Sequence, residues 1–202
     1  MINALFFPLL VILLCATLGD LTVPLFIGKK YRDYNHLTYT ISALGSKDSA
    51  VQKLECSNLI IVGALLLAFA IGQYLLFDSI TWAVNLYTLG IVLFAIGCIL
   101  AGIFPEDPLG VPETASGKVH GIASGLGFFF LIMNPLWAVW IINFNAYQII
   151  NIVLFIIGIF TFGLFMISEN KATGILNYTG LYQRLNLIIL YTVLILNYIK
   201  LK

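Results

Sequence analysis

The sequence has 202 residues, of which 61% are hydrophobic and only 9% charged, and its formal net charge is +1. Soluble domains carry about 25% charged residues, so this chain lacks the polar surface that a water-soluble protein needs, and the lipid bilayer is its expected partner. A net charge this close to zero provides no basic surface for phosphates, which excludes nucleic acid as a partner.

Six apolar stretches approach or exceed the roughly 20 residues that a helix needs to cross a bilayer. In chain order they are residues 4–27, 58–77, 82–104, 119–142, 149–167 and 185–199. The sequence therefore predicts an all-α, polytopic membrane protein, in which residues 1–202 form a single domain of six transmembrane helices. Pro135 lies within the fourth stretch and lacks an N–H group, so we expect a kink there.

The connections between these stretches alternate in length. Residues 78–81 and 143–147 are short turns, whereas the connections 28–57, 105–118 and 168–184 are longer and polar. Because every crossing changes the side of the membrane, the three long connections must all lie on the same side.

Lysine and arginine are concentrated on the side of the long connections. The residues on that side are Lys29, Lys30, Arg32, Lys47, Lys53, Lys118, Lys171 and Arg184. Only Lys200 and Lys202 lie on the other side. The positive-inside rule then predicts a multi-pass protein of the cell membrane with its long connections in the cytoplasm. Aromatic residues of the kind that mark an interface are expected at the opposite edge, namely Trp82, Trp137, Trp140 and Tyr147.

Asp20 is the only acidic residue within the predicted spans. An ionisable group inside a membrane helix is a candidate functional residue. The alternative is a structural role, in which Asp20 pairs with Arg184 or Lys118 or reaches the interface.

The first long connection is rich in tyrosine, which favours a folded loop on the membrane surface over a disordered linker. Its candidate polar residues are His36 and Ser42. His36 could equally be an ordinary surface histidine, since an isolated histidine indicates no particular chemistry.

The second long connection contains three prolines, which favour an extended and stiff backbone. We expect it to hold Glu106 and Asp107 near the headgroups, with Thr114 or Ser116 as the cap of the following helix. His120 is expected in the first turn of that helix. The alternative is that the acids only keep the loop solvated and that His120 only anchors the helix.

The two histidines could form a metal site with Asp107 or Glu106, because neutral imidazoles and a carboxylate are suitable ligands. The sequence contains no HExxH motif, and Ser42 is not part of a GxSxG motif. No glycine-rich phosphate-binding loop is present, so we expect no cofactor.

Several short motifs occur together in a characteristic order: YNHL at residues 34–37, ISALG at 41–45, GIFPEDP at 102–108, HG at 120–121 and GLYQR at 180–184. In this combination the chain resembles a prokaryotic six-helix membrane family known as domain of unknown function 998. Where that family commonly has an acid in the first loop, this chain has Ala43. A fainter likeness to a eukaryotic six-helix family, with autophagy modulators and a GPI-lipid remodelling factor, implies a lipid-related role.

The leading functional hypothesis is a polar site that the three long connections form on one membrane face. It would bind a lipid headgroup or a small amphipathic ligand through Asp20, His36, Ser42, Asp107, His120 and Arg184. One alternative is a lipid hydrolase or transferase that uses His36, His120 and Asp107. Another is a non-catalytic subunit of a membrane transport complex, with a membrane protein as its partner.

Overall fold

The protein is described here from a computed structural model, in which residues 4–108, 110–142, 145–170 and 174–200 are placed. Within these residues the regular structure is entirely helical. The α-helices are α1 (Phe6–Ile27), α2 (Gln52–Tyr74), α3 (Trp82–Ile103), α4 (Ala115–Ile132), α5 (Asn134–Ile141), α6 (Asn145–Asn170) and α7 (Thr179–Lys200). Three short 3-10 helices cover Gly28–Lys30, Ser42–Gly45 and Gly174–Asn177.

Among the residues that the structure describes, six helical segments are long and apolar enough to cross a membrane, with α4 and α5 together forming the fourth. The predicted all-α polytopic class is thus confirmed. Four helices begin earlier than their apolar stretches. They are α2 at Gln52 rather than residue 58, α4 at Ala115 rather than 119, α6 at Asn145 rather than 149, and α7 at Thr179 rather than 185. Their first turns contain polar residues, which hydropathy alone does not assign to a span.

The fourth crossing is interrupted at Met133, where α4 ends and α5 begins. Pro135 lies at the start of α5 and cannot donate a backbone hydrogen bond to the preceding turn. The fully buried Asn134 side chain donates to the carbonyl oxygen of Tyr87 at 3.0 Å and so attaches the break to α3. The predicted kink is confirmed as a break between two helices.

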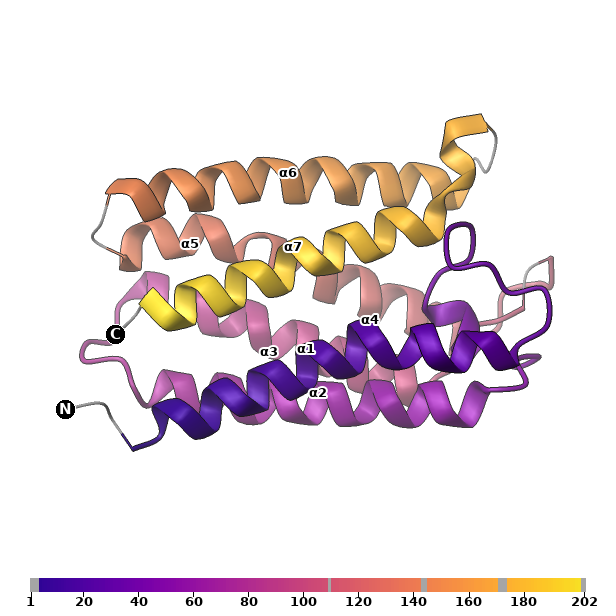
Figure 1. Cartoon of the computed structure of the whole chain (residues 1–202), viewed down its shortest axis with the longest axis horizontal. Helices are drawn as coiled ribbons and strands as arrows, with labels where there is room; N and C mark the ends of the chain where they lie inside the picture. The colour runs from indigo at the N-terminus through magenta and orange to yellow at the C-terminus, as the bar shows by residue number, and fades with distance from the viewer. Residues whose placement is uncertain (1–3, 109, 143–144, 171–173, 201–202) are drawn as a thin grey trace.

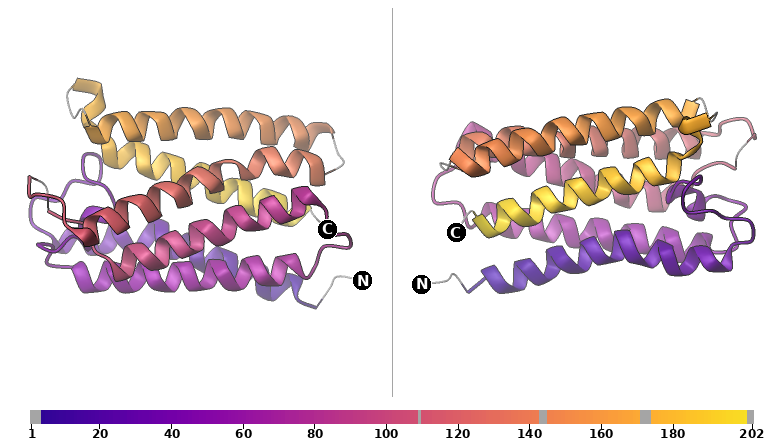
Figure 2. Two further views of the ribbon diagram at one scale, coloured as in Figure 1. Left: turned by 180° about the vertical axis from the view of Figure 1, so that it is seen from behind. Right: turned by 45° about the horizontal axis from the view of Figure 1, so that its top comes forward.

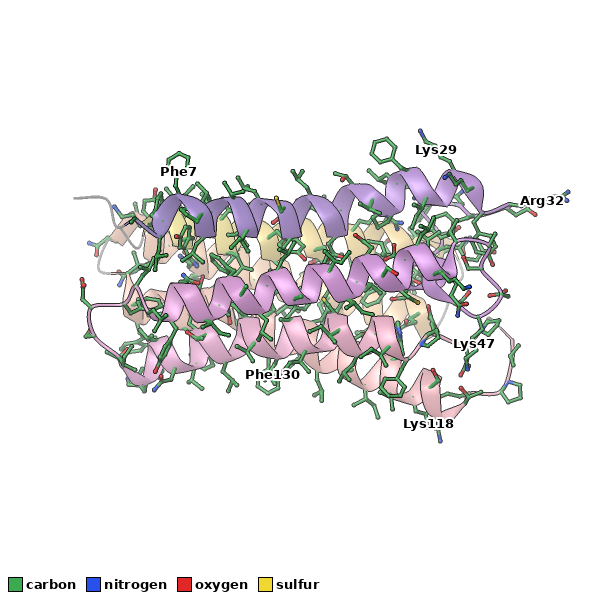
Figure 3. All side chains as sticks on the ribbon, turned by 90° about the horizontal axis from the view of Figure 1, so that it is seen from below. Phe7, Lys29, Arg32, Lys47, Lys118 and Phe130 are labelled. Atoms are coloured by element: carbon green, nitrogen blue, oxygen red, sulfur yellow. The ribbon has the colours of Figure 1, made fainter. Side chains whose placement is uncertain are left out.

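The helices run along one long axis, with the start of α1 and the end of α7 at the same end (Figure 1). The three long connections lie together at the other end, which we call the loop end; the further views agree (Figure 2). This is the arrangement that parity predicted. Lys29, Arg32, Lys47 and Lys118 all lie at the loop end (Figure 3).

Three tryptophans gather at the opposite end of the bundle. The ring of Trp82 lies 6.2 Å from that of Trp137 and 5.7 Å from that of Trp140, measured between ring centroids. Aromatic residues of this kind are favoured at the membrane–water interface.

The bundle interior is closely packed, with Leu13, Leu66 and Leu194 fully buried. Helices α2 and α3 approach so closely that a Cβ atom at Gly63 would lie 2.5 Å from the carbonyl oxygen of Ala95. Small residues allow this kind of backbone approach in membrane helices. Large apolar side chains such as Phe7, which is 68% exposed, point outward as a lipid-facing surface requires.

Candidate functional site

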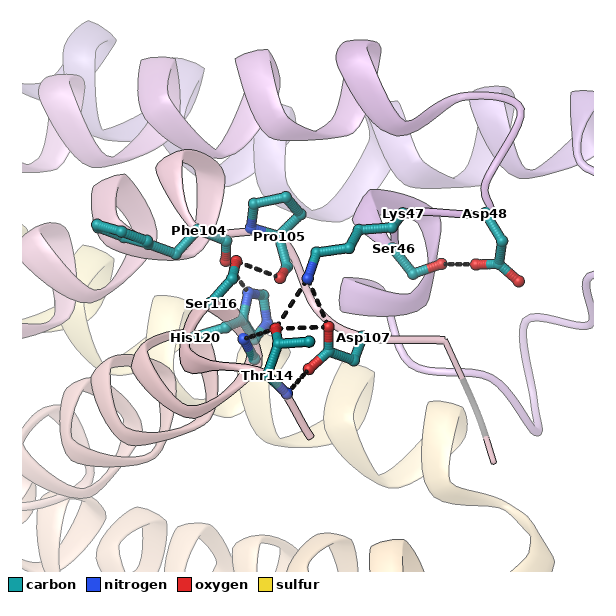
Figure 4. Close-up of polar contacts among 10 residues, drawn as sticks. Ser46, Lys47, Asp48, Phe104, Pro105, Asp107, Thr114, Ser116 and His120 are labelled. Atoms are coloured by element: carbon teal, nitrogen blue, oxygen red, sulfur yellow. Dashed lines mark hydrogen bonds and ion pairs between the residues drawn. The ribbon is translucent and has the colours of Figure 1, made fainter. Parts of the chain in front are cut away.

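Asp107 connects the first and second long connections. One carboxylate oxygen accepts from Lys47 Nζ at 2.6 Å and from Thr114 Oγ1 at 2.9 Å, and the other accepts from the Thr114 backbone N–H at 2.6 Å (Figure 4). The hydrogen bond from Lys47, followed by that from the Thr114 backbone, lowers the pKa of Asp107 to about 2. The carboxylate therefore holds the two connections together.

Thr114 is the N-cap of α4, because its hydroxyl accepts from the backbone N–H of Gly117 at 3.3 Å. The absence of a Cβ at Gly117 is required here, since a Cβ would collide with Oδ2 of Asp107. Of the two caps that the sequence offered, Thr114 is the correct one. Ser116 instead donates from its hydroxyl to the carbonyl oxygen of Pro105 at 2.9 Å.

His120 is buried, with 5% of its surface exposed. It lies in the second turn of α4, not in the first as expected, because the helix already begins at Ala115. Its Nδ1 lies 3.0 Å from the carbonyl oxygen of Phe104 and 3.2 Å from that of Ala101. A carbonyl oxygen can only accept, so Nδ1 carries a proton. Nε2 is buried and has no hydrogen-bond partner among the described residues.

Arg184 attaches the first long connection to α7. Its NH1 donates to the carbonyl oxygens of His36 at 2.7 Å and Tyr39 at 3.1 Å, and its NH2 donates to the Tyr34 hydroxyl at 2.7 Å. NH2 also lies 3.3 Å from Nδ1 of His36, which must accept because a guanidinium only donates. Burial, and then the charges of Arg184 and Lys29, lower the pKa of His36.

The first connection is folded, as its tyrosines predicted. The Leu181 N–H donates to the carbonyl oxygen of Leu37 at 2.9 Å, and the Ile41 N–H donates to Oε1 of Gln183 at 2.6 Å. A Cβ at Gly180 would collide with the carbonyl oxygen of Tyr39, so this glycine is required for the loop to contact α7.

Asp20 is buried in the bundle, where its Oδ2 accepts from the Tyr191 hydroxyl at 2.8 Å. The pairing with Arg184 or Lys118, which was one structural alternative for Asp20, is not formed. Arg184 is occupied by the first connection, and Lys118 is exposed on α4.

Glu55 also lies inside a membrane helix, so the expectation that Asp20 is the only acid within a span is wrong. It is fully buried in the first turn of α2, and neither carboxylate oxygen has a partner among the described residues. Sequence reasoning missed it because α2 begins before its apolar stretch. The only signal was its position a few residues before that stretch.

An open cleft of about 1100 Å³ lies at the loop end, between the second connection, α4 and α6. Its polar lining comprises Thr40, Ser42, Glu106, Asp107, Glu113, His120, Ser124, Glu169 and Gln183. A second cleft of about 1290 Å³ shares Thr40, Glu106, Asp107 and Glu169 with the first. Glu169 and Gln183 were not among the residues that the sequence singled out, and Glu106 was considered only as an alternative metal ligand to Asp107.

The six candidate residues thus fall into separate groups. Ser42, Asp107 and His120 line the cleft of about 1100 Å³, whereas Asp20 lines a separate, smaller pocket together with Ser42. His36 and Arg184 line none of these spaces and instead contact each other. Within the described part of the chain, no three His, Cys, Asp or Glu side chains are grouped so that they could hold a metal ion. The metal ligands suggested by the sequence are therefore not assembled.

The family model described as "Protein of unknown function (DUF998)" matches residues 14–198. The chain belongs to this family. The match extends from α1 to α7 and includes all six candidate residues, which confirms the resemblance found in the short motifs. Comparisons of this DUF998 protein with curated proteins and with solved structures give no match.

Proposed function

We propose that the protein binds an amphipathic molecule, such as a lipid, with its polar head in the loop-end cleft. The observation that carries the proposal is the change of lining with depth. On α6, Glu169 lies at the loop end, and Phe165 and Met166 follow about one turn further into the bundle. On α4, His120 is followed by Phe128 two turns deeper. A molecule with a polar head and an apolar tail matches this order.

Space for an apolar tail is available along α4. Gly117, Gly121 and Gly125 are four residues apart and so share one face of the helix. A Cβ at Gly121 or Gly125 would meet no described atom within 4 Å. Both glycines line the cleft, so this face of α4 is open to an occupant.

The proposal is tested by filling the cleft. Gly121→Leu and Gly125→Leu each add a side chain to its lining, and Gly163→Leu is the matched control. Gly163 is also a helical glycine with open space around its Cβ position, but it does not line the cleft. Molecules bound to the full-length protein purified in nanodiscs are identified by native mass spectrometry. We expect both cleft variants to lose a bound amphiphile that wild type and the control retain; equal retention by all four would disprove the proposal.

We also propose that the protein lies in the cell membrane and that its loop end faces the cytoplasm. The support is the concentration of lysine and arginine on the long connections, which the positive-inside rule associates with the cytoplasmic side. Cysteines introduced at the two ends of the bundle and labelled from outside intact cells test this orientation.

A further inference from the structure

The charge of the loop-end cleft is opposite to the charge of the loop end around it. Most lysines and arginines of the chain lie on the long connections, yet none lines either cleft among the described residues. The acids in the lining are Asp48, Glu106, Asp107, Glu113 and Glu169. Lys47 neutralises only Asp107, with which it forms an ion pair at 2.6 Å. The cleft is therefore a poor site for a phosphate and a suitable one for a cation.

Two acceptor atoms in this cleft lack donors. His120 is 5% exposed, and its Nε2 is a bare acceptor because Nδ1 donates to backbone carbonyls. Oε2 of Glu106 is also buried, and it too has no partner in the described structure. Buried polar atoms nearly always have partners, so an acceptor pair of this kind at a cleft is suited to a ligand with N–H or O–H donors.

We propose that the head of the bound amphiphile is a primary ammonium group, which Glu106 and Glu169 attract by charge and which donates a hydrogen bond to Nε2 of His120. This inference rests on the proposed function and names its ligand class. An ammonium has three N–H donors and one positive charge, so it satisfies the bare acceptors and the acidic lining together. A trimethylammonium head has the charge without the donors, and a phosphate head has the wrong charge.

The pH dependence of Glu106 supports the same ligand. Burial, and then the nearby carboxylates of Glu169, Asp107 and Asp48, raise the pKa of Glu106 to about 7. The cation of Lys47 is engaged by Asp107. Binding of an ammonium should thus strengthen as the pH rises through about 7, where Glu106 loses its proton. An alkyl ammonium remains charged there, since a lysine-like amine has a pKa of about 10.4.

The test uses the full-length protein in phosphatidylcholine nanodiscs, with empty nanodiscs subtracted as background. The probes are dodecylamine, dodecyltrimethylammonium and dodecyl phosphate, which share one tail length. At pH 8 we expect dodecylamine to bind at least tenfold more tightly than the other two probes. At pH 6 we expect dodecylamine to bind less tightly than it does at pH 8. Tighter binding of dodecyl phosphate, or equal binding of the two cationic probes, would overturn the inference.

Substitutions in the cleft lining test whether dodecylamine binds in the cleft. Glu106→Gln, Glu169→Gln and His120→Phe should each weaken dodecylamine binding at least fivefold. Asp33→Asn is the matched control, because Asp33 is an exposed acid of the same loop end that lies outside both clefts. Helical content and a single size-exclusion peak show which variants are folded. If folded Glu106→Gln and Glu169→Gln bind dodecylamine as wild type does, the inference is wrong.

Two sources could supply the amine, and a further arm distinguishes them. Replacing part of the phosphatidylcholine by phosphatidylethanolamine should reduce dodecylamine binding if the natural head belongs to an aminophospholipid. If dodecylamine still binds and its binding is not reduced, the natural ligand is a free long-chain amine.

Failure of this inference can be distinguished from failure of the proposed function. Preferred binding of dodecyl phosphate refutes only the ammonium head. Binding of no probe, together with no effect of Gly121→Leu on the retained amphiphile, refutes the proposed function itself.

Discussion

Lys47 and Asp107 form an ion pair at 2.6 Å between two loops whose residues are 60 positions apart in the sequence. The backbone N–H of Lys47 also donates to the carbonyl oxygen of Glu106 at 3.3 Å. The pair therefore determines how the first and second connections meet, and with it the shape of the cleft between them.

Asp107→Asn should lower the melting temperature at pH 7, because the amide loses the charge-assisted bond from Lys47. Since folding lowers the pKa of Asp107 from 3.8 to about 2, its contribution is complete above about pH 4 and disappears as the pH falls through about 2. In melting curves recorded between pH 7 and pH 2, the melting temperature of the wild type should approach that of the variant at the acidic end. A difference in melting temperature between wild type and Asp107→Asn that stays constant over this range would contradict the role of the pair. An equal loss of melting temperature in Asp33→Asn would contradict it as well.

Glu106 should affect stability in the opposite direction. Folding raises its pKa from 4.5 to about 7, so the folded state holds this proton more tightly than the unfolded state does. Glu106 therefore stabilises the folded state at low pH, and the free energy of unfolding should fall as the pH rises from about 4.5 through about 7. Glu106→Gln should remove this decline in melting temperature. Glu113→Gln, an exposed acid on the same connection, is the control and should keep the decline.

Arg184→Lys should loosen the first connection without unfolding the bundle. A lysine has no planar fork and cannot reproduce the bonds to His36, Tyr39 and Tyr34. Loss of one hydrogen bond to a charged group costs about 1.5–3 kcal/mol, so amide hydrogen exchange in residues 34–41 should accelerate about tenfold or more. Arg32→Lys is the control, because Arg32 is 95% exposed and pairs with Asp33 alone among the described residues. Unchanged exchange in Arg184→Lys would show that other contacts hold the loop.

The orientation of the protein is tested by cysteine labelling in a variant without Cys15, Cys56 and Cys98. Asp78 is exposed in the turn between α2 and α3, and Asp33 is exposed in the first long connection; each is replaced by cysteine. With the loop end in the cytoplasm, an impermeant maleimide should label Asp78→Cys in intact cells and Asp33→Cys only after permeabilisation. The reverse pattern would place the loop end outside.

The sequence by itself determined the six crossings, the gathering of the long connections at one end and the break near Pro135. These features depend on the solvation of apolar stretches, on the parity of crossings and on the missing N–H of proline, all of which are local or topological. Thr114 as a cap is local in the same sense. None of these features requires knowledge of how one helix is rotated against another.

Only the tertiary structure decided which polar groups meet. Asp20 and Tyr191 are 171 positions apart and meet because α1 and α7 turn these residues toward each other. Arg184 contacts the first connection rather than Asp20, and His120 and Glu106 lie in one cleft away from His36. The rotation of each helix about its axis follows from side-chain packing between helices, and hydropathy carries little information about it where a span is apolar on every face.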